Sequence, residues 1–252
     1  MYGCDISSAD SLMTGNGRGL QMIAGSNQPY LFPYIGSWQL INYVDVFVIS
    51  DSMQYINKGY INRNNILLNG KKHLFTLEAV GAKSETVIND VRVGNNAKKL
   101  LSTFHHAYTR APEFDQVFPM IEQVLLNPER SLGKFVGYSI QKVAQFLEMD
   151  TKFLYLSDLQ GETNLKGQER TIDICKRVEA DQFVNAIGGK ELYDVDGFKR
   201  EGIDLYFLRP EFIEYRQFNF DFVPSLSIID ILMFNSKASV KSMLTKFTLE
   251  QS

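Results

Sequence analysis

The chain has 252 residues, of which 44% are hydrophobic and 22% are charged, and its formal net charge is -3. This length is enough for one large domain with a proper core. The near-neutral charge excludes the broad basic surface that is typical of duplex-binding proteins. The longest apolar runs, such as LSIIDILMF, contain an aspartate or are far too short to cross about 30 Å of bilayer hydrocarbon. We therefore expect neither a nucleic-acid partner nor a membrane span.

The N-terminal segment, residues 1–21, is rich in Ser, Gly and Asp and lacks the basic start and apolar core of a secretory signal. We expect a flexible extension there, and one hypothesis places the functional start at Met22. The two cysteines, Cys4 and Cys175, have neither metal-ligand spacing nor a second pair that would form a disulfide framework. A reducing, cytoplasmic location is therefore predicted, and no metal or cofactor is predicted.

The first patterned segment is a β-loop-α-β unit, with a strand over residues 21–26, a helix over 36–44 and a second strand over 45–50. Because the second strand is apolar throughout, it suits a parallel sheet that is covered on both faces. In such sheets ligands bind at the carboxyl ends of the strands. Residues 61–80 then read as a β-hairpin turning at Asn69-Gly70, a pair that accepts positive φ angles, and residues 85–93 as a further strand.

Residues 95–149 form a block of helical pattern that separates two sheet-bearing parts. Alternation of strands and helices resumes after it, with strands predicted at 151–157, 181–189 and 203–208 and helices at 167–178, 194–202, 226–234 and 237–247. The predicted fold class is α/β, with a mainly parallel sheet core, an inserted hairpin and the helical block; a Rossmann-like arrangement is one form of such a sheet. We expect a single domain over residues 22–252 with a helical subdomain around 95–149. The strand order does not follow from the sequence.

A rigid apolar loop, QPYLFPYIG, follows the first strand, where α/β proteins usually place their chemistry. Two prolines in it fix their own φ angles and bias the residues before them toward extended geometry. The loop is either a stiff core-packing segment or the wall of a pocket that is lined by its aromatic side chains, Phe32 included. Its candidate substrate-binding residues are Gln28, Tyr30, Tyr34 and Gly36.

The densest run of polar side chains, DSMQYINKGYINRN, follows the second strand. Asp51 is the candidate base or orienting group, and Lys58 and Arg63 are the candidate catalytic cations that hold a phosphate or carboxylate. The candidate binding residues of this run are Gln54, Tyr55, Asn62 and Asn64. A solvated turn that leads into the hairpin explains each residue equally well taken alone.

Three further features have plain structural explanations. His105 and His106 are adjacent on a predicted helix and diverge by about 100°, so they do not serve one site. Gly188 and Gly189 resemble a phosphate-facing turn but also fit an ordinary turn. Ser227 and Asp230 have the spacing of a helix capping box.

Residues 28–64 resemble the WbqC-like protein family, through the family's Q-P-Y-F-x-P-Y-x-G loop at Gln28–Gly36, its D-x-F-V-x-x-D strand at Asp45–Asp51 and its Q-Y…N-R-N segment at Gln54–Asn64. The resemblance continues to about residue 240 through RTIDICKRVEADQFVNAIGGKELYD, FKREGIDLYF and FVPSLSIIDILMFN. The segment before Met22 has no counterpart in the family, and NAIGGKE departs from the family's usual glycine turn.

This resemblance implies a bacterial, cytoplasmic protein of surface-polysaccharide or O-antigen biosynthesis. The function it suggests is a transferase acting on a nucleotide-linked sugar, with acyl or aminoacyl transfer to a sugar amine as one reaction that would suit. The expected partner is then a small molecule, a sugar nucleotide. A non-catalytic module that binds a sugar nucleotide or another protein is the alternative that the residues leave open, and the oligomeric state does not follow from the sequence.

Overall fold

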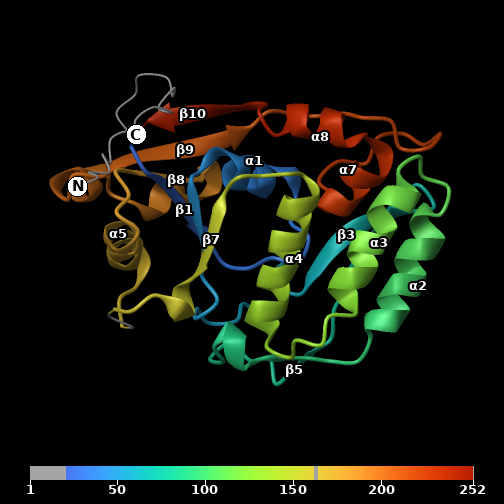
Figure 1. Ribbon diagram of the computed structural model, residues 1–252, viewed down its shortest axis with the longest axis horizontal. Helices are drawn as coiled ribbons and strands as arrows, with labels where there is room; N and C mark the ends of the chain where they lie inside the picture. Colours follow the sequence, from blue (N-terminus) through green and yellow to red (C-terminus); the bar gives the residue numbers. More distant parts are fainter. Residues whose placement is uncertain (1–20, 162–163, 252) are drawn as a thin grey trace, which may run out of the picture.

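The computed structural model describes residues 21–161 and 164–251, so the predicted N-terminal extension lies outside the described residues except for Gln21 (Figure 1). Six strands form the main sheet in the order β10-β9-β8-β1-β2-β7. Their bounds are β1 Ile23–Asn27, β2 Val46–Ile49, β7 Lys152–Tyr155, β8 Gln182–Ala186, β9 Asp204–Pro210 and β10 Phe247–Gln251. Five are parallel and β10 runs antiparallel to β9. The predicted α/β class is confirmed.

The helices lie around this sheet (Figure 1). Their bounds are α1 Ile35–Tyr43, α2 Ala97–Tyr108, α3 Phe114–Leu125, α4 Leu132–Phe146, α5 Gly167–Arg177, α6 Val195–Arg200, α7 Ile228–Phe234 and α8 Lys237–Met243, with short 3-10 helices η1 Ile88–Asp90, η2 Leu156–Asp158 and η3 Ile187–Leu192.

The sheet is covered on both faces because its central strands are apolar on both. Phe47 and Ile49 of β2 belong to the large core that includes α1 and α4, whereas Val46 and Val48 pack with Ile174 of α5. Alternate residues of a strand point to opposite faces, so this division follows from the uninterrupted apolar run VFVI. The large core continues through the hairpin to α2 and α3, so the helical block shares one core with the sheet.

The hairpin forms as predicted. Strands β3 (Arg63–Leu68) and β4 (Lys71–Thr76) pair antiparallel around Asn69 and Gly70, whose φ angles are 52° and 72°. Positive φ at both turn residues is the requirement of the tight turn that Asn-Gly supplies. The predicted strand over 85–93 is reduced to η1 and β6 (Arg92–Val93), which pairs with β5 (Ala79–Val80).

The C-terminal helix predicted over 237–247 ends earlier than expected. Helix α8 stops at Met243, and Phe247 opens strand β10 on the free edge of β9. The pattern FTLEQ is too short and too polar to show a strand by itself; the edge of β9 supplies the hydrogen bonds that make it one.

Candidate functional site

The site lies beside β1, at the point where the chain stops adding strands on one side of the sheet and begins to add them on the other. From β1 the chain adds β2 and β7 on one side and then β8 and β9 on the other, so β1 and β8 are neighbours whose connections leave in opposite directions. Ligands of open α/β sheets bind at the carboxyl ends of the strands at such a point. A cavity of about 520 Å³ lies there. The Rossmann-like subdivision stays a prediction, but this reversal is its defining feature.

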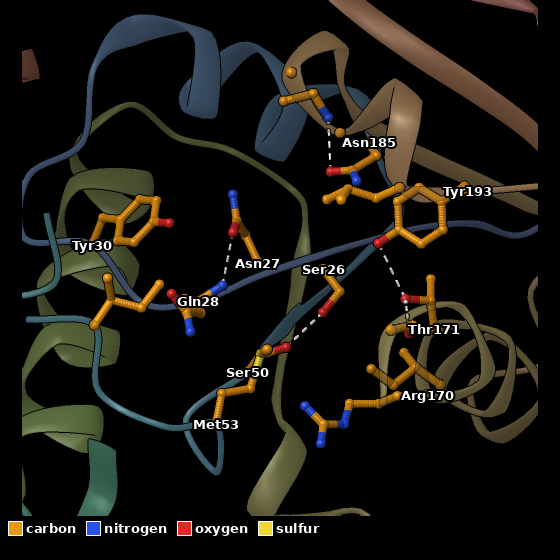
Figure 2. A pocket seen from close by; sticks show the side chains of 17 residues that line it. Ser26, Asn27, Gln28, Tyr30, Ser50, Met53, Arg170, Thr171, Asn185 and Tyr193 are labelled. Atoms are coloured by element: carbon orange, nitrogen blue, oxygen red, sulfur yellow. Dashed lines mark hydrogen bonds between the residues drawn. The ribbon is translucent and has the colours of Figure 1, made fainter. Parts of the chain in front are cut away.

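The inner cavity, as we call this space, is lined by residues that follow three strands and by the start of α5 (Figure 2). They are Ser26, Asn27, Gln28, Tyr30, Ser50, Met53, Ile56, Gly167, Arg170, Thr171, Ile174, Asn185, Ala186, Gly188, Gly189, Leu192 and Tyr193. An outer cavity of about 640 Å³ adjoins it and shares Gln28 and Arg170 with it, and its other lining residues include the exposed Gln54 and Lys166. The two spaces together are called the cleft below.

Two serines form the floor of the inner cavity. The Ser26 hydroxyl lies 3.0 Å from the carbonyl oxygen of Val48 and 2.8 Å from the Ser50 hydroxyl. If Ser26 donates to the carbonyl, Ser50 donates to Ser26, and the Ser50 oxygen keeps lone pairs for a ligand.

Two asparagines at the strand ends present amide donors. Asn27 Oδ1 accepts the backbone N–H of Gln28 at 2.8 Å, and Asn185 Oδ1 accepts that of Ala186 at the same distance (Figure 2). Each bond fixes its side-chain oxygen, so the orientation of each amide is set. Within the described residues neither NH₂ group has an acceptor.

Arg170 is the charged residue of the inner cavity. Its guanidinium makes no hydrogen bond or ion pair with any described residue. Lys166 adds a second cation to the outer cavity, and the described lining of both cavities contains no aspartate or glutamate. A cleft that holds cations without carboxylates, in a chain of net charge -3, favours an anionic ligand.

Two tyrosines add neutral polar groups to the cleft. Burial raises the pKa of Tyr30, and burial also raises the pKa of Tyr193 although its hydrogen bond to Thr171 opposes the shift. Because a tyrosine already titrates near pH 10, both phenols stay protonated at neutral pH. They therefore serve as hydrogen-bonding groups.

The proline loop divides between the core and two different cavities. Leu31 and Phe32 are fully buried, so Phe32 belongs to the core and lies outside the described lining of the cleft. Gln28 and Tyr30 line the inner cavity, and Gln28 Oε1 is buried without a partner among the described residues. Tyr34 faces a separate small cavity of about 80 Å³.

Gly36 serves the packing of a helix against a strand. It lies in the first turn of α1, where a Cβ atom would come within 2.7 Å of the Pro210 side chain. The close approach at this glycine is therefore made by β9, and Gly36, a candidate substrate-binding residue, lies outside the described lining of the cleft.

Asp51 is fully buried, lies outside the described lining of the cleft and points toward η1, η2 and α4. Its carboxylate accepts hydrogen bonds from Ser157 N at 2.9 Å, Ser157 Oγ at 2.6 Å and Asn89 Nδ2 at 2.7 Å. The Lys134 ammonium lies 3.5 Å from the same carboxylate. These contacts join the end of β2 to η1, η2 and α4, so a structural role is enough to explain why this aspartate is buried. The catalytic role of Asp51 stays a prediction.

The two other candidate catalytic residues also lie outside the described lining of the cleft. Arg63 donates from Nε to the carbonyl of Gly59 at 2.8 Å and from Nη2 to that of Lys58. Lys58 is exposed and has a φ of 60°. The guanidinium of Arg63 thus closes the turn that contains Lys58.

The amides of the polar run hold the proline loop and the hairpin. Asn64 Nδ2 donates to the carbonyl of Phe32 at 2.8 Å, and Asn62 Nδ2 donates to that of Leu77 at 2.7 Å. The Tyr55 hydroxyl donates to Asn62 Oδ1 at 2.8 Å. Gln54 is the candidate binding residue of this run that lines the cleft, beside its neighbours Ser52, Met53 and Ile56, and its carbonyl accepts Gln28 Nε2 at 3.3 Å.

Gly188 and Gly189 line the inner cavity, and their role in substrate binding stays a prediction. A Cβ at Gly189 would lie 2.5 Å from Asn185 Nδ2, so a glycine is needed for that amide to hold its position. At Gly188 a Cβ would meet open space.

The remaining polar candidates have structural partners. His105 packs edge-on against Phe114 and Phe118. Ser227 caps α7, but Asp230 does not complete a capping box: its carboxylate accepts hydrogen bonds from Tyr108 at 2.7 Å, Tyr215 at 2.7 Å and Gln217 at 2.6 Å. No group of three or more His, Cys, Asp or Glu residues is placed to hold a metal in the part of the chain that the structure describes. The described helices are all too short or too polar to span a bilayer.

Sequence reasoning missed Ser26, Asn27, Ser50, Arg170 and Asn185. A signal for the serines was present, because Ser50 continues the face of Val46 and Val48 whereas Asp51 belongs to the opposite face. Arg170 and Asn185 become neighbours of β1 only through the order of the strands.

The fold and the cleft define an α/β protein that has a cavity of small-molecule size at the crossover of its sheet. The chain belongs to the WbqC-like protein family, whose family model matches residues 28–242. It is also similar to a Mycobacterium tuberculosis (strain ATCC 25618 / H37Rv) protein described as "Uncharacterized protein Rv1507c", with 24% identity over 213 residues that cover 81% of this chain and 90% of the relative. No solved structure matches the chain.

Proposed function

We propose that this WbqC-like protein binds a sugar nucleotide in the cleft and acts as a transferase on it, within bacterial surface-polysaccharide (O-antigen) biosynthesis. The observation that carries the proposal is the unpaired Arg170 in a crossover cavity whose described lining has no carboxylate. A sugar nucleotide combines an anionic diphosphate with uncharged hydroxyl-rich and amide-rich groups. Those are the groups that a cation and a set of neutral polar side chains recognise.

The binding part of the proposal is tested with a panel of sugar nucleotides and nucleotides in a thermal-shift assay. A ligand at 100 times its Kd adds about 2.7 kcal/mol to the free energy of unfolding. We expect at least one sugar nucleotide to raise the melting temperature more than its free sugar does. If no member of the panel raises it, a nucleotide-linked substrate is ruled out.

The transferase part is tested by mass spectrometry on the sugar nucleotide that binds best. We propose acyl or aminoacyl transfer to a sugar amine, so the expected product is heavier by the transferred group. Among the catalytic candidates, Asp51, Lys58 and Arg63, none lines the described cleft, so Arg170 and Lys166 are the better candidates to bind phosphate. A cytoplasmic location belongs to the same proposal, and deletion of the gene in its host is expected to alter the surface polysaccharide.

A non-catalytic binding module is the second candidate. It is favoured by the chemistry of the described cleft lining, which contains no aspartate, glutamate, histidine or cysteine to act as a base or nucleophile. Saturable binding of a sugar nucleotide without a new product, in the presence of acyl and aminoacyl donors, would favour this function over the transferase.

A further inference from the structure

The two parts of the cleft differ in chemistry, and this difference bears on the orientation of the ligand. The outer cavity contains Lys166 and shares Arg170, so both cations of the described cleft lining come from the start of α5, whose Glu169 does not line either cavity. The inner cavity ends at the strand tips, where Asn27, Ser50 and Asn185 are uncharged. In Figure 2, Arg170 and Asn185 lie well apart across the cavity.

The asparagine amides offer donors to the inner part of a ligand. Because each Oδ1 is fixed by the next backbone N–H, the NH₂ group cannot exchange places with the oxygen without losing that bond. Asn185 is held further by Gly189, which leaves just enough space for its nitrogen. At its strand-tip end the inner cavity therefore offers amide donors without a described charged side chain, which suits uncharged groups that accept hydrogen bonds, such as hydroxyl and carbonyl oxygens.

We propose that the cleft binds its ligand in one orientation, with the phosphates against Arg170 and Lys166 and an uncharged, acceptor-rich end against the amide of Asn185. This inference rests on the proposed function and makes Arg170 and Asn185 the residues that determine specificity. Arg170 selects for phosphate, because its guanidinium can bind two phosphate oxygens at once and has no competing carboxylate among the described residues. Asn185 selects for the neutral part.

The test uses isothermal titration of the full chain with three kinds of probe: inorganic pyrophosphate, nucleoside 5′-diphosphates, and the uncharged nucleosides and free sugars. Arg170→Ala is expected to weaken the binding of pyrophosphate and nucleoside diphosphates by about tenfold or more, because a charge-assisted hydrogen bond is lost. The affinity for the uncharged probes is expected to stay unchanged. Arg110→Ala is the matched control, because Arg110 is exposed, lies outside the cleft and removes the same charge. It is expected to change none of these affinities.

Asn185→Asp is the second variant. It keeps the volume of the side chain and the bond to the Ala186 N–H, and it replaces the free NH₂ donor by an oxygen. We expect weaker binding of at least one uncharged probe, the nucleoside or the sugar, by about fivefold or more. Circular dichroism of each variant establishes that it is folded.

The outcomes separate the two levels of the proposal. If no probe binds the unmodified protein, both the proposed function and the orientation fail. If probes bind but Arg170→Ala weakens uncharged and phosphorylated probes equally, or Asn185→Asp weakens no uncharged probe, the orientation is wrong and the binding function stands.

Discussion

The substitution Asp51→Asn separates a structural aspartate from a catalytic one. Two hydrogen bonds, from Asn89 Nδ2 and Ser157 Oγ, end at Oδ2, and Ser157 N donates to Oδ1. In the variant the amide oxygen can keep the bond from Ser157 N, which places an NH₂ group at the position of Oδ2. The Ser157 hydroxyl can rotate and accept from it, but the Asn89 amide then faces another donor.

The expected cost follows from this count. Hydrogen bonds to a charged group contribute about 1.5–3 kcal/mol each, and a buried donor left unpaired costs about 1–3 kcal/mol. We therefore expect the free energy of unfolding to fall by about 2–4 kcal/mol. For a chain of this length that corresponds to a melting temperature lower by about 5–15 °C.

Urea unfolding, followed by the fluorescence of Trp38, is the assay. Trp38 is the only tryptophan and is fully buried in α1, so its emission reports loss of the core. Asp158→Asn is the matched control, because Asp158 also pairs with Lys134 but its side chain is 64% exposed. An exposed pair contributes about 0–1 kcal/mol, so this variant is expected to unfold nearly like the unmodified protein.

The outcome for Asp51→Asn decides between the two roles. A folded variant with lower stability and unchanged ligand affinity supports the structural role. Unchanged stability together with complete loss of product would refute our reasoning and establish the catalytic prediction for Asp51.

Three further substitutions or treatments test other parts of the structure. Gly189→Ala places a Cβ within 2.5 Å of Asn185 Nδ2, so we expect ligand affinity to fall several-fold in titrations while the melting temperature changes little. Asn64→Ala removes the amide donor of the Phe32 carbonyl, which keeps its hydrogen bond from the Ser227 hydroxyl, so urea unfolding is expected to show a loss of about 0.5–1.5 kcal/mol, the contribution of one hydrogen bond. Burial raises the pKa of the Cys175 thiol from 9.0 to about 12, so iodoacetamide at pH 8 is expected to label it only after unfolding. The pKa of this thiol is higher in the folded than in the unfolded chain, so the unfolded chain loses the proton first as the pH rises. The contribution of the thiol to the free energy of unfolding is therefore complete below pH 9 and is lost as the pH approaches 12. A free energy of unfolding that rises over this range would contradict the prediction.

Local elements were predictable from the sequence because local chemistry specifies them. The Asn69-Gly70 turn carries its own backbone requirement, and the apolar run VFVI indicates a strand that is buried on both faces. The order of the strands depends on contacts between segments far apart in the chain, and no local pattern encodes it. For this reason Arg170 and Asn185 were not recognised as site residues, although both stand in the segment RTIDICKRVEADQFVNAIGGKELYD that resembles the family; the pairing of β8 with β1 brings that segment to the cleft.

The polar run after β2 shows why density of polar residues is a poor guide to a site. Backbone carbonyls accept the hydrogen bonds that the side chains of Asn62, Arg63 and Asn64 donate. A loop packed against the core has carbonyl groups that water cannot reach, so they need partners inside the protein. A side chain whose hydrogen bonds are all made inside the protein has little left for a ligand. The informative groups are those that still have hydrogen-bonding capacity for a ligand. By that criterion the cleft residues Arg170 and Asn185 are stronger candidates than Arg63 and Asn64, although all four stand in segments that resemble the family. Under the proposed function the N-R-N motif would act indirectly, because Asn64 holds the loop that presents Gln28 and Tyr30 to the cavity.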